Sequence, residues 1–303
     1  MRRRRQGRNV NGVLLLDKPA GISSNAALQK VKRLFQARKA GHTGSLDPLA
    51  TGMLPVCLGE ATKISSFLLE ADKSYHVLIR LGITTTTGDA EGTILESKSV
   101  APFDRGRLLE VLASFSGEIE QIPPMHSAVK QNGQPLYKLA HQGIVVARAP
   151  RQVRIHELEL LRHDNEWLEI RVRCSKGTYI RTLAEDIGAL LTCGAHVSAL
   201  RRLAVAGFAE QDMVCMSHLE QIAESDVPAL DGHLMPMGDA LLHWPGLSMS
   251  RDVVYFFRQG QTVFVPHAPI SGYVRIYTRD EQFVGIGQVQ DDGRIAPKRL
   301  LAR

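Results

Sequence analysis

The chain has 303 residues, of which 44% are hydrophobic and 22% are charged, proportions that exclude a disordered, collagen-like or coiled-coil protein. A chain of this length can bury a substantial core, and we expect one large domain and a smaller one. Its 37 lysines and arginines outnumber the 31 acidic residues, and the pI of about 9.2 is compatible with a polyanionic partner without establishing one.

Arginines crowd the N-terminus, at positions 2–5 and 8. We expect residues 1–9 to form a basic flexible tail that either touches phosphates or is simply solvated. No apolar stretch approaches the roughly 20 residues that span a bilayer, and no signal-type hydrophobic segment follows the arginines. These features predict a cytoplasmic protein that has no membrane partner.

The four cysteines are far apart and form no Cys-x-x-Cys pair; they are Cys57, Cys174, Cys193 and Cys215. This spacing suggests neither a zinc site nor a disulfide scaffold. We therefore expect reduced, mostly buried thiols.

The first predicted elements are a strand, a turn and a helix. Residues 12–17 have the apolar composition of a buried strand, and the turn Lys18-Pro19-Ala20-Gly21 follows. Ser23 or Ser24 is expected to cap a helix whose apolar residues recur at helical spacing up to Phe35. Over residues 75–81 every second residue is apolar and inward-facing, which predicts a half-buried strand.

The middle of the chain mixes helices and strands. Helices are expected over residues 105–115, 179–191 and 217–224, and strands over residues 153–162 and 167–175. The two kinds of element do not alternate regularly. This order favours an α+β fold over a parallel sheet of βαβ units.

A change of pattern near residue 245 predicts a domain boundary. Residues 226–244 contain Pro228, Pro236 and two glycines, as a linker does, and short strands are expected beyond them at residues 273–278 and 283–289. We therefore expect a small β-rich domain at the C-terminus.

The segment 41–52, GHTGSLDPLATG, is a glycine-punctuated loop that places one carboxylate, Asp47, beside a proline. An Asp-Pro pair is a favoured way to begin a turn, so an ordinary turn is one interpretation. A nucleotide-binding loop is the other, but the Gly-Lys-Ser/Thr ending of such loops is missing. Nucleotide hydrolysis is therefore not expected.

This loop resembles, almost residue for residue, the motif of the TruB family of pseudouridine synthases. Three further blocks resemble the family in the same order, at residues 12–24, 73–75 and 176–184. A fifth block, residues 122–137, resembles the family's RNA-gripping insertion, although His126 stands where we expect a tyrosine. The resemblance covers roughly residues 10–210, with a weaker match to the family's C-terminal RNA-binding domain.

The resemblance implies a domain plan and a reaction. The pseudouridine synthase catalytic fold, with a mixed, largely antiparallel sheet, is expected over residues 10–245, with the insertion at about 122–147. A small PUA-like RNA-binding domain is expected over residues 246–303. The implied activity is conversion of uridine to pseudouridine at position 55, in the T loop of tRNA. Because pseudouridine and uridine contain the same atoms, no cofactor and no metal are expected.

Site residues are carried over from the family block by block. Asp47 is implied to be the catalytic carboxylate, acting as a nucleophile or as a base on the ribose, and Arg181 its guanidinium partner; a surface helix charge is the alternative for Arg181. The implied uridine-binding residues are His42, Tyr75, Tyr179 and Leu200. Lys18 and Pro19 are implied to support the active site from a neighbouring turn.

Tyr75 is implied to stack on the flipped uracil, which is compatible with its also being a core residue of a strand. Phosphate contacts are expected from a cationic stretch around the insertion, each member of which is alternatively a solvated surface charge; the residues are Lys130, Lys138, Arg148, Arg151 and Arg154. Tyr137 of the insertion is also implied to bind RNA.

Three functions remain open. The first is a stand-alone tRNA isomerase, which by resemblance is a monomer without an obligate protein partner. The second is a tRNA-binding chaperone with secondary or no catalysis, although Asp47, Tyr75 and Arg181 together disfavour pure binding. The third is a guide-RNA-dependent enzyme acting on ribosomal RNA. The insertion at 122–147 favours a protein that grips its own stem-loop.

Overall fold

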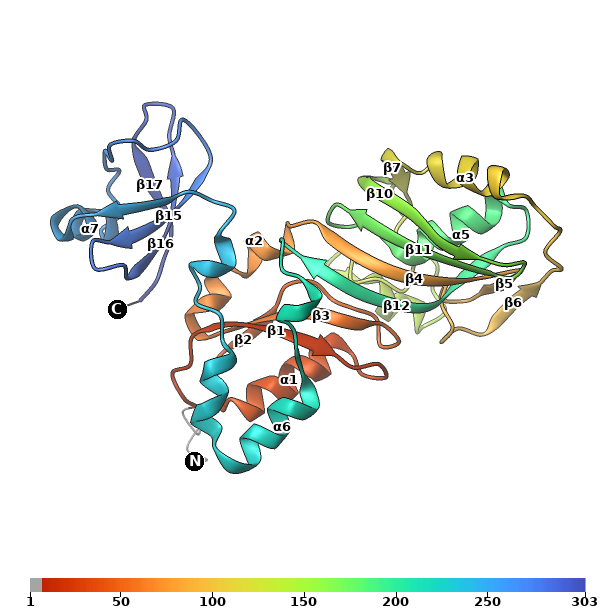
Figure 1. The fold of residues 1–303 in the computed structure, drawn as a ribbon, viewed down its shortest axis with the longest axis horizontal. Helices are drawn as coiled ribbons and strands as arrows, with labels where there is room; N and C mark the ends of the chain where they lie inside the picture. The colour runs from red at the N-terminus through yellow and green to blue at the C-terminus, as the bar shows by residue number, and fades with distance from the viewer. Residues whose placement is uncertain (1–6, 303) are drawn as a thin grey trace.

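The structure is a computed structural model that describes residues 7–302. The greater part of the expected basic tail therefore lies outside the described residues. Within them the chain forms one nine-stranded sheet, one four-stranded sheet and two short two-stranded ribbons, together with helices that cover the sheets (Figure 1).

The nine-stranded sheet is mixed and largely antiparallel. In order across it lie β13 (Val214–Cys215), β1 (Gly12–Lys18), β3 (Thr51–Leu58), β12 (Ala195–Val205), β4 (Lys73–Leu81), β11 (Trp167–Cys174), β10 (Arg151–His163) and β7 (Gly117–Gln121), and β2 (Ala40–His42) pairs with β3. The pairs β1–β13 and β3–β12 are parallel, and the others are antiparallel. The expected α+β fold is confirmed.

Two groups of helices pack on the sheet. Helix α1 (Ser24–Leu34) begins at Ser23, whose side chain accepts a hydrogen bond from the Ala26 amide, and it shares an apolar cluster with α6 (Met216–Ser225), β1 and β3. Helices α3 (Arg105–Ala113) and α5 (Ile180–Leu190) cover β4, β10 and β11. Figure 1 shows the two groups at separate parts of the sheet.

Strand β4 has the predicted alternation. Its inward residues, from Lys73 to Leu81, are buried against the cluster that includes α5, and the residues between them are half-buried. On the outer side His76 pairs with Glu169 of β11 at 2.6 Å. One face of the strand therefore packs in the core, and the other face has polar side chains that are partly exposed to solvent.

The shorter elements complete the large domain. They are η1 (Gly59–Lys63), α2 (Ser65–Leu69), the ribbon of β5 (Ile83–Thr85) and β6 (Ile94–Ser97), the ribbon of β8 (Lys130–Gln131) and β9 (Gln134–Pro135), α4 (Leu136–Ala140), η2 (Glu210–Asp212), η3 (Val227–His233) and η4 (Asp239–Leu241). The predicted linker at 226–244 is thus partly folded. Leu230 and Leu241 are buried, and Met235 exchanges two backbone hydrogen bonds with Val13 of β1.

The C-terminal domain is β-rich, as predicted, and contains one four-stranded sheet. Its order is β14 (Gly246–Met249), β15 (Tyr273–Thr278), β16 (Phe283–Val289) and β17 (Ile295–Leu300), and α7 (Arg251–Arg258) packs beside it. This sheet lies at one end of the molecule, next to α2 (Figure 1). No helix within residues 7–302 is long and apolar enough to cross a membrane.

Candidate active site

Asp47 lies in the loop between β2 and β3, and buried polar groups from distant parts of the chain hold this loop. The Ser24 hydroxyl, at the start of α1, accepts from the Leu46 amide at 2.7 Å and donates to the Leu46 carbonyl at 2.9 Å. Ser24 is 3% exposed, so both bonds are shielded from water. Both the amide and the carbonyl of Leu46, the residue before Asp47, are therefore held in place.

Lys18 holds the loop from the end of β1. Its fully buried ammonium donates to the carbonyls of Pro19 and Ile22, both at 2.8 Å, and of Pro48 at 3.2 Å. Burial lowers the pKa of Lys18 to about 8, and the charges of Glu91 and Asp47 partly offset that effect. Lys18 thus links the turn at Pro19 to Pro48, the residue that follows Asp47.

Arg202 of β12 is a third support, and the sequence analysis did not single it out. Its side chain is almost fully buried, and its guanidinium donates to the carbonyls of Met53 at 2.6 Å and Gly44 at 3.1 Å, one on each side of the Asp47 loop. At Gly52 (φ +96°) a methyl group would lie 2.2 Å from the Arg202 carbonyl oxygen, so this close approach requires glycine.

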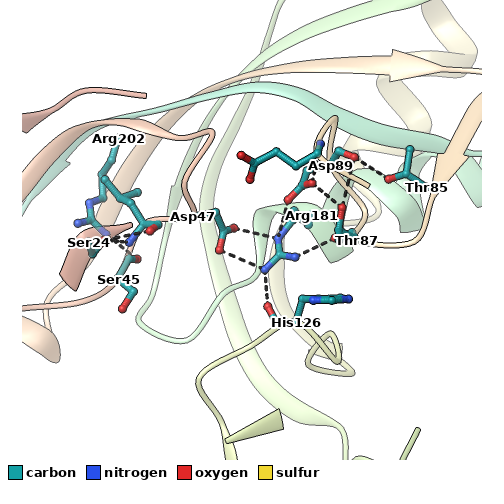
Figure 2. Close-up of polar contacts among 11 residues, drawn as sticks. Ser24, Ser45, Asp47, Thr85, Thr87, Asp89, His126, Arg181 and Arg202 are labelled. Carbon is teal, nitrogen blue, oxygen red and sulfur yellow. Dashed lines mark hydrogen bonds and ion pairs between the residues drawn. The ribbon is translucent and has the colours of Figure 1, made fainter. Parts of the chain in front are cut away.

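Asp47 and Arg181 meet in the structure, although 134 positions separate them. Nε of Arg181 lies 2.9 Å from Oδ2 of Asp47, and Nη2 lies 3.3 Å from Oδ1, so the guanidinium contacts both carboxylate oxygens (Figure 2). The Arg181 side chain is 5% exposed and that of Asp47 is 36% exposed. A buried cation therefore orients a carboxylate that remains accessible from solvent.

Arg181 also donates to two backbone carbonyls. Nη1 donates to the Thr87 carbonyl and Nη2 to the His126 carbonyl, each at 2.8 Å. The alternative that Arg181 is a surface helix charge is wrong. The bond to His126 connects the insertion to the partner of Asp47, and the His126 ring packs edge-on against that of His141, 5.8 Å away.

Asp89 is a second carboxylate near Arg181 that the sequence analysis missed. Its side chain is 4% exposed and its Oδ2 lies 3.8 Å from Arg181 Nε. It accepts a hydrogen bond from the Thr87 hydroxyl at 2.5 Å (Figure 2). It also accepts one from the Glu91 amide at 3.1 Å. The polar segment 84–92, which follows β4 and ends in Gly-Asp-Ala-Glu-Gly, was the available sign of a structured turn.

The surroundings of Asp47 raise its pKa above the ordinary aspartate value of 3.8. Burial is the largest cause, the charge of Arg181 opposes it, and the nearby charge of Asp89 adds to it. The ionised carboxylate is consequently more basic than an aspartate in water. It suits a group that must attack carbon or accept a proton.

The four residues predicted to bind uridine come from different elements. Tyr75 of β4 is 8% exposed and Leu200 is 7% exposed, and both belong to the apolar cluster that contains Leu46 and Ala50 on either side of Asp47. Leu200 lies within β12, which continues through Arg201 and Arg202 to Val205. Burial raises the pKa of the Tyr75 hydroxyl.

His42 and Tyr179 are half-buried. His42 ends β2, its Nδ1 has no hydrogen-bond partner among residues 7–302, and burial and the charge of Arg202 lower its pKa. The backbone of Tyr179, just before α5, exchanges two hydrogen bonds with the side chain of buried Gln121, at 3.0 and 3.3 Å. The lowered pKa favours the neutral form of the His42 imidazole, and the bonds to Gln121 hold the backbone of Tyr179 in place.

The predicted cationic stretch is divided between two parts of the fold. The insertion carries Lys130 on β8 and Tyr137 and Lys138 on α4, all exposed, whereas Arg151 and Arg154 are exposed on β10. Arg148 is half-buried, and its Nη1 donates to the carbonyl of Pro123 in the insertion at 3.2 Å.

Metal ligands and thiols do not gather at the site. Among residues 7–302 no group of three or more His, Cys, Asp or Glu side chains is arranged to hold a metal ion. The cysteines are unpaired; three are buried and Cys215 is exposed.

Comparison with known proteins identifies the family. The chain is 57% identical to a protein of Nitrosococcus oceani named tRNA pseudouridine synthase B, over 99% of this chain and 97% of the relative. It is 54% identical to proteins of the same name from Coxiella burnetii and Pseudomonas aeruginosa, over 98% and 97% of this chain and 96% and 97% of the relatives. The chain belongs to the TruB family of pseudouridine synthases. It is an isomerase.

Family descriptions and solved structures agree with this membership. "TruB family pseudouridylate synthase (N terminal domain)" matches residues 32–180, "tRNA pseudouridylate synthase B C-terminal domain" matches residues 181–242, and "Pseudouridine synthase II TruB, C-terminal" matches residues 245–301. A Cbf5-Nop10-Gar1 complex contains a chain with TM-score 0.74 and 28% identity, over 96% of this pseudouridine synthase and 84% of that chain. A chain in a structure of an H/ACA RNP bound to a substrate RNA shares the fold, with a TM-score of 0.72 and 23% identity. The match covers 96% of this chain and 85% of that chain.

Proposed function

We propose that this enzyme converts the uridine at position 55, in the T loop of tRNA, to pseudouridine, with Asp47 as the reacting carboxylate. The supporting observation is the two-point contact between buried Arg181 and the partly exposed carboxylate of Asp47. The relatives named tRNA pseudouridine synthase B, which match over nearly the full chain, support tRNA as the substrate.

The reaction needs a carboxylate that is ionised, oriented and accessible. The bond from ribose C1′ to N1 breaks, the base turns, C5 joins C1′, the proton on C5 leaves, and N1 takes up a proton. The product is therefore an isomer of the substrate, and the C5 proton exchanges with water. Asp47 either attacks as a nucleophile or removes a ribose proton, and the arrangement with Arg181 suits both routes. Lys18, Ser24 and Arg202 position the loop for this step.

The base must leave the RNA stack before it can reach Asp47. Extrusion costs a few kcal/mol, and stacking on an aromatic ring contributes about 1–3 kcal/mol. We assign the stacking contact to Tyr75 and the rest of the uridine pocket to Tyr179 and Leu200, with His42 filling the space that the base leaves. Because the two energies are similar, further contacts must offset the cost of extrusion.

Phosphate contacts are the proposed source of the remaining binding energy. The exposed cations of the insertion and of β10 suit the T stem-loop, and binding through them is expected to weaken with salt. Arg148, which is occupied by the Pro123 carbonyl, is a weaker candidate than Lys130, Lys138, Arg151 or Arg154. We propose that residues 246–303 form the PUA-like RNA-binding domain and that the enzyme acts as a monomer without an obligate protein partner.

A tRNA-binding chaperone with secondary or no catalysis is the alternative. Purified protein incubated with unmodified tRNA, with the product position mapped, separates the functions. Pseudouridine at position 55 without added RNA or protein supports the proposal. Binding without product supports the chaperone, and dependence on an added guide RNA supports a guide-directed enzyme.

A further inference from the structure

The C-terminal domain docks on the segment Gly59–Leu69, which is η1 and α2. Lys63 donates to the Leu300 carbonyl at 2.9 Å, and the Ala302 amide donates to Glu60 at 2.7 Å. Ile286 of β16 is fully buried in the same apolar cluster as Met53 of β3. The contact therefore combines polar tethers with a shared core, and the two domains do not merely touch at a flexible joint.

Phe67 of α2 is at the centre of this contact. Its ring packs edge-on against Trp244 at 5.0 Å and Tyr273 at 5.2 Å, and those two rings are 5.0 Å apart. Trp244 lies two residues before β14, and Tyr273 begins β15. Edge-to-face aromatic contacts have a preferred geometry, so this cluster fixes the orientation of α2 relative to the C-terminal sheet.

The opposite end of α2 reaches the active-site loop. Leu69 is 46% exposed and faces Gly44: a methyl group placed on Gly44 would lie 3.6 Å from Leu69 Cδ1. Lys73 donates to the carbonyls of Leu69 at 2.7 Å and Ala71 at 2.5 Å, and Lys73 begins β4 two residues before Tyr75. Figure 1 shows α2 between the two sheets.

A second connection runs through β3. Met53 packs in the cluster that includes Ile286, and its carbonyl accepts from Arg202 Nε at 2.6 Å. The same guanidinium donates to Gly44. Both routes from the C-terminal domain therefore end at Gly44, three residues before Asp47.

We propose that Phe67 is a positioning residue for the reaction, through which the docked C-terminal domain fixes α2 against the Asp47 loop. The proposal rests on the proposed function. It assigns the C-terminal domain a role in the chemical step, in addition to any contact with RNA. Small displacements of a reacting group have large effects on rate, about 100-fold for 1 Å.

The test compares Phe67→Ala and Leu69→Ala with the parent. The readouts are the single-turnover rate, followed by release of tritium from tRNA labelled at uridine C5, and the Kd for tRNA. We expect both variants to react about 10- to 100-fold more slowly while Kd changes less than about threefold. Phe67→Tyr, which keeps the ring, is expected to restore the rate.

Phe103→Ala is the matched control, because Phe103 is also a partly buried aromatic of the large domain, packed near His163 on the side of α3. It is expected to leave both readouts unchanged. Leu69→Ala keeps the test decisive if Phe67→Ala does not fold, since substitutions of exposed side chains are normally near neutral for stability.

Three results overturn the coupling. The first is a folded Phe67→Ala enzyme that reacts at the parental rate, and the second is a Leu69→Ala enzyme that does so. The third is a loss of tRNA affinity large enough to explain the loss of rate. A parent protein that forms no pseudouridine contradicts the proposed function itself. An active parent with a fully active Leu69→Ala variant contradicts the coupling alone.

Discussion

Replacing Arg181 by methionine removes the cation beneath Asp47 while keeping an unbranched side chain. Two contacts to the carboxylate are lost, an ion pair at 2.9 Å and a hydrogen bond at 3.3 Å. Taking each as equivalent to a hydrogen bond to a charged group, about 1.5–3 kcal/mol, the carboxylate loses roughly 3–6 kcal/mol of orienting interaction. At about 1.4 kcal/mol per factor of ten, the single-turnover rate is expected to fall about 10²- to 10⁴-fold.

The same change also lowers stability. Buried Asp89 loses its neighbouring cation, and the carbonyls of Thr87 and His126 lose their donor. Breaking a buried pair costs about 3–5 kcal/mol, and the partial exposure of Asp47 places the expected value at the lower end. Urea unfolding of the variant measures this term separately from the rate.

Arg201→Met is the control for the Arg181 prediction. Arg201 contacts both oxygens of Asp17, at 3.0 and 2.9 Å, but its side chain is 30% exposed and does not touch Asp47. We expect this variant to retain the parental rate and to lose at most about 1 kcal/mol of stability. The reasoning is refuted if Arg181→Met reacts within tenfold of the parent at saturating tRNA, or if its affinity for tRNA falls in parallel with its rate.

Three further predictions concern the same loop. Asp47→Asn, nearly isosteric, is expected to bind tRNA with the parental Kd and form no pseudouridine; normal turnover would remove Asp47 from the mechanism. Burial raises the pKa of Asp47 above 3.8, so the acid limb of kcat/KM against pH should lie above that value. The charge of Arg181 opposes this rise, so in Arg181→Met the pKa should increase further and the acid limb should move to higher pH. An unmoved limb contradicts the pairing of Asp47 with Arg181. Gly52→Ala, which forces a methyl group to 2.2 Å from the Arg202 carbonyl at φ +96°, should cost about 3 kcal/mol or more in urea unfolding, and a neutral result would show that the loop relaxes.

Regular elements were predictable where one physical pattern dominates. The alternation in β4 and the serine cap of α1 appear in the sequence because side-chain direction and a local hydrogen bond determine them. The strands at Tyr273–Thr278 and Phe283–Val289 were predicted with the bounds that the structure has. These features depend on neighbours close in sequence.

The supports of the site were harder to predict. Arg202 and Asp89 are buried charges whose partners lie far along the chain or in an irregular turn, and a charged residue in such a segment normally indicates a solvated surface. Lys18 and Arg181 were identified through the family resemblance and not through periodicity. The partly folded segment 226–244 was missed because prolines and glycines also occur in 3₁₀ turns, here packed against β1.

The anchoring of the Asp47 loop has a consequence for the order of folding. Its three supports come from the end of β1, the start of α1 and the far strand β12, so the loop acquires its shape after strands distant in the sequence have paired. During synthesis from the N-terminus, a nascent chain that has not yet reached Arg202 contains the carboxylate without its full support. The active site is therefore completed late in folding. A fragment that ends before β12 is expected to be inactive, even though it contains Asp47 and Arg181.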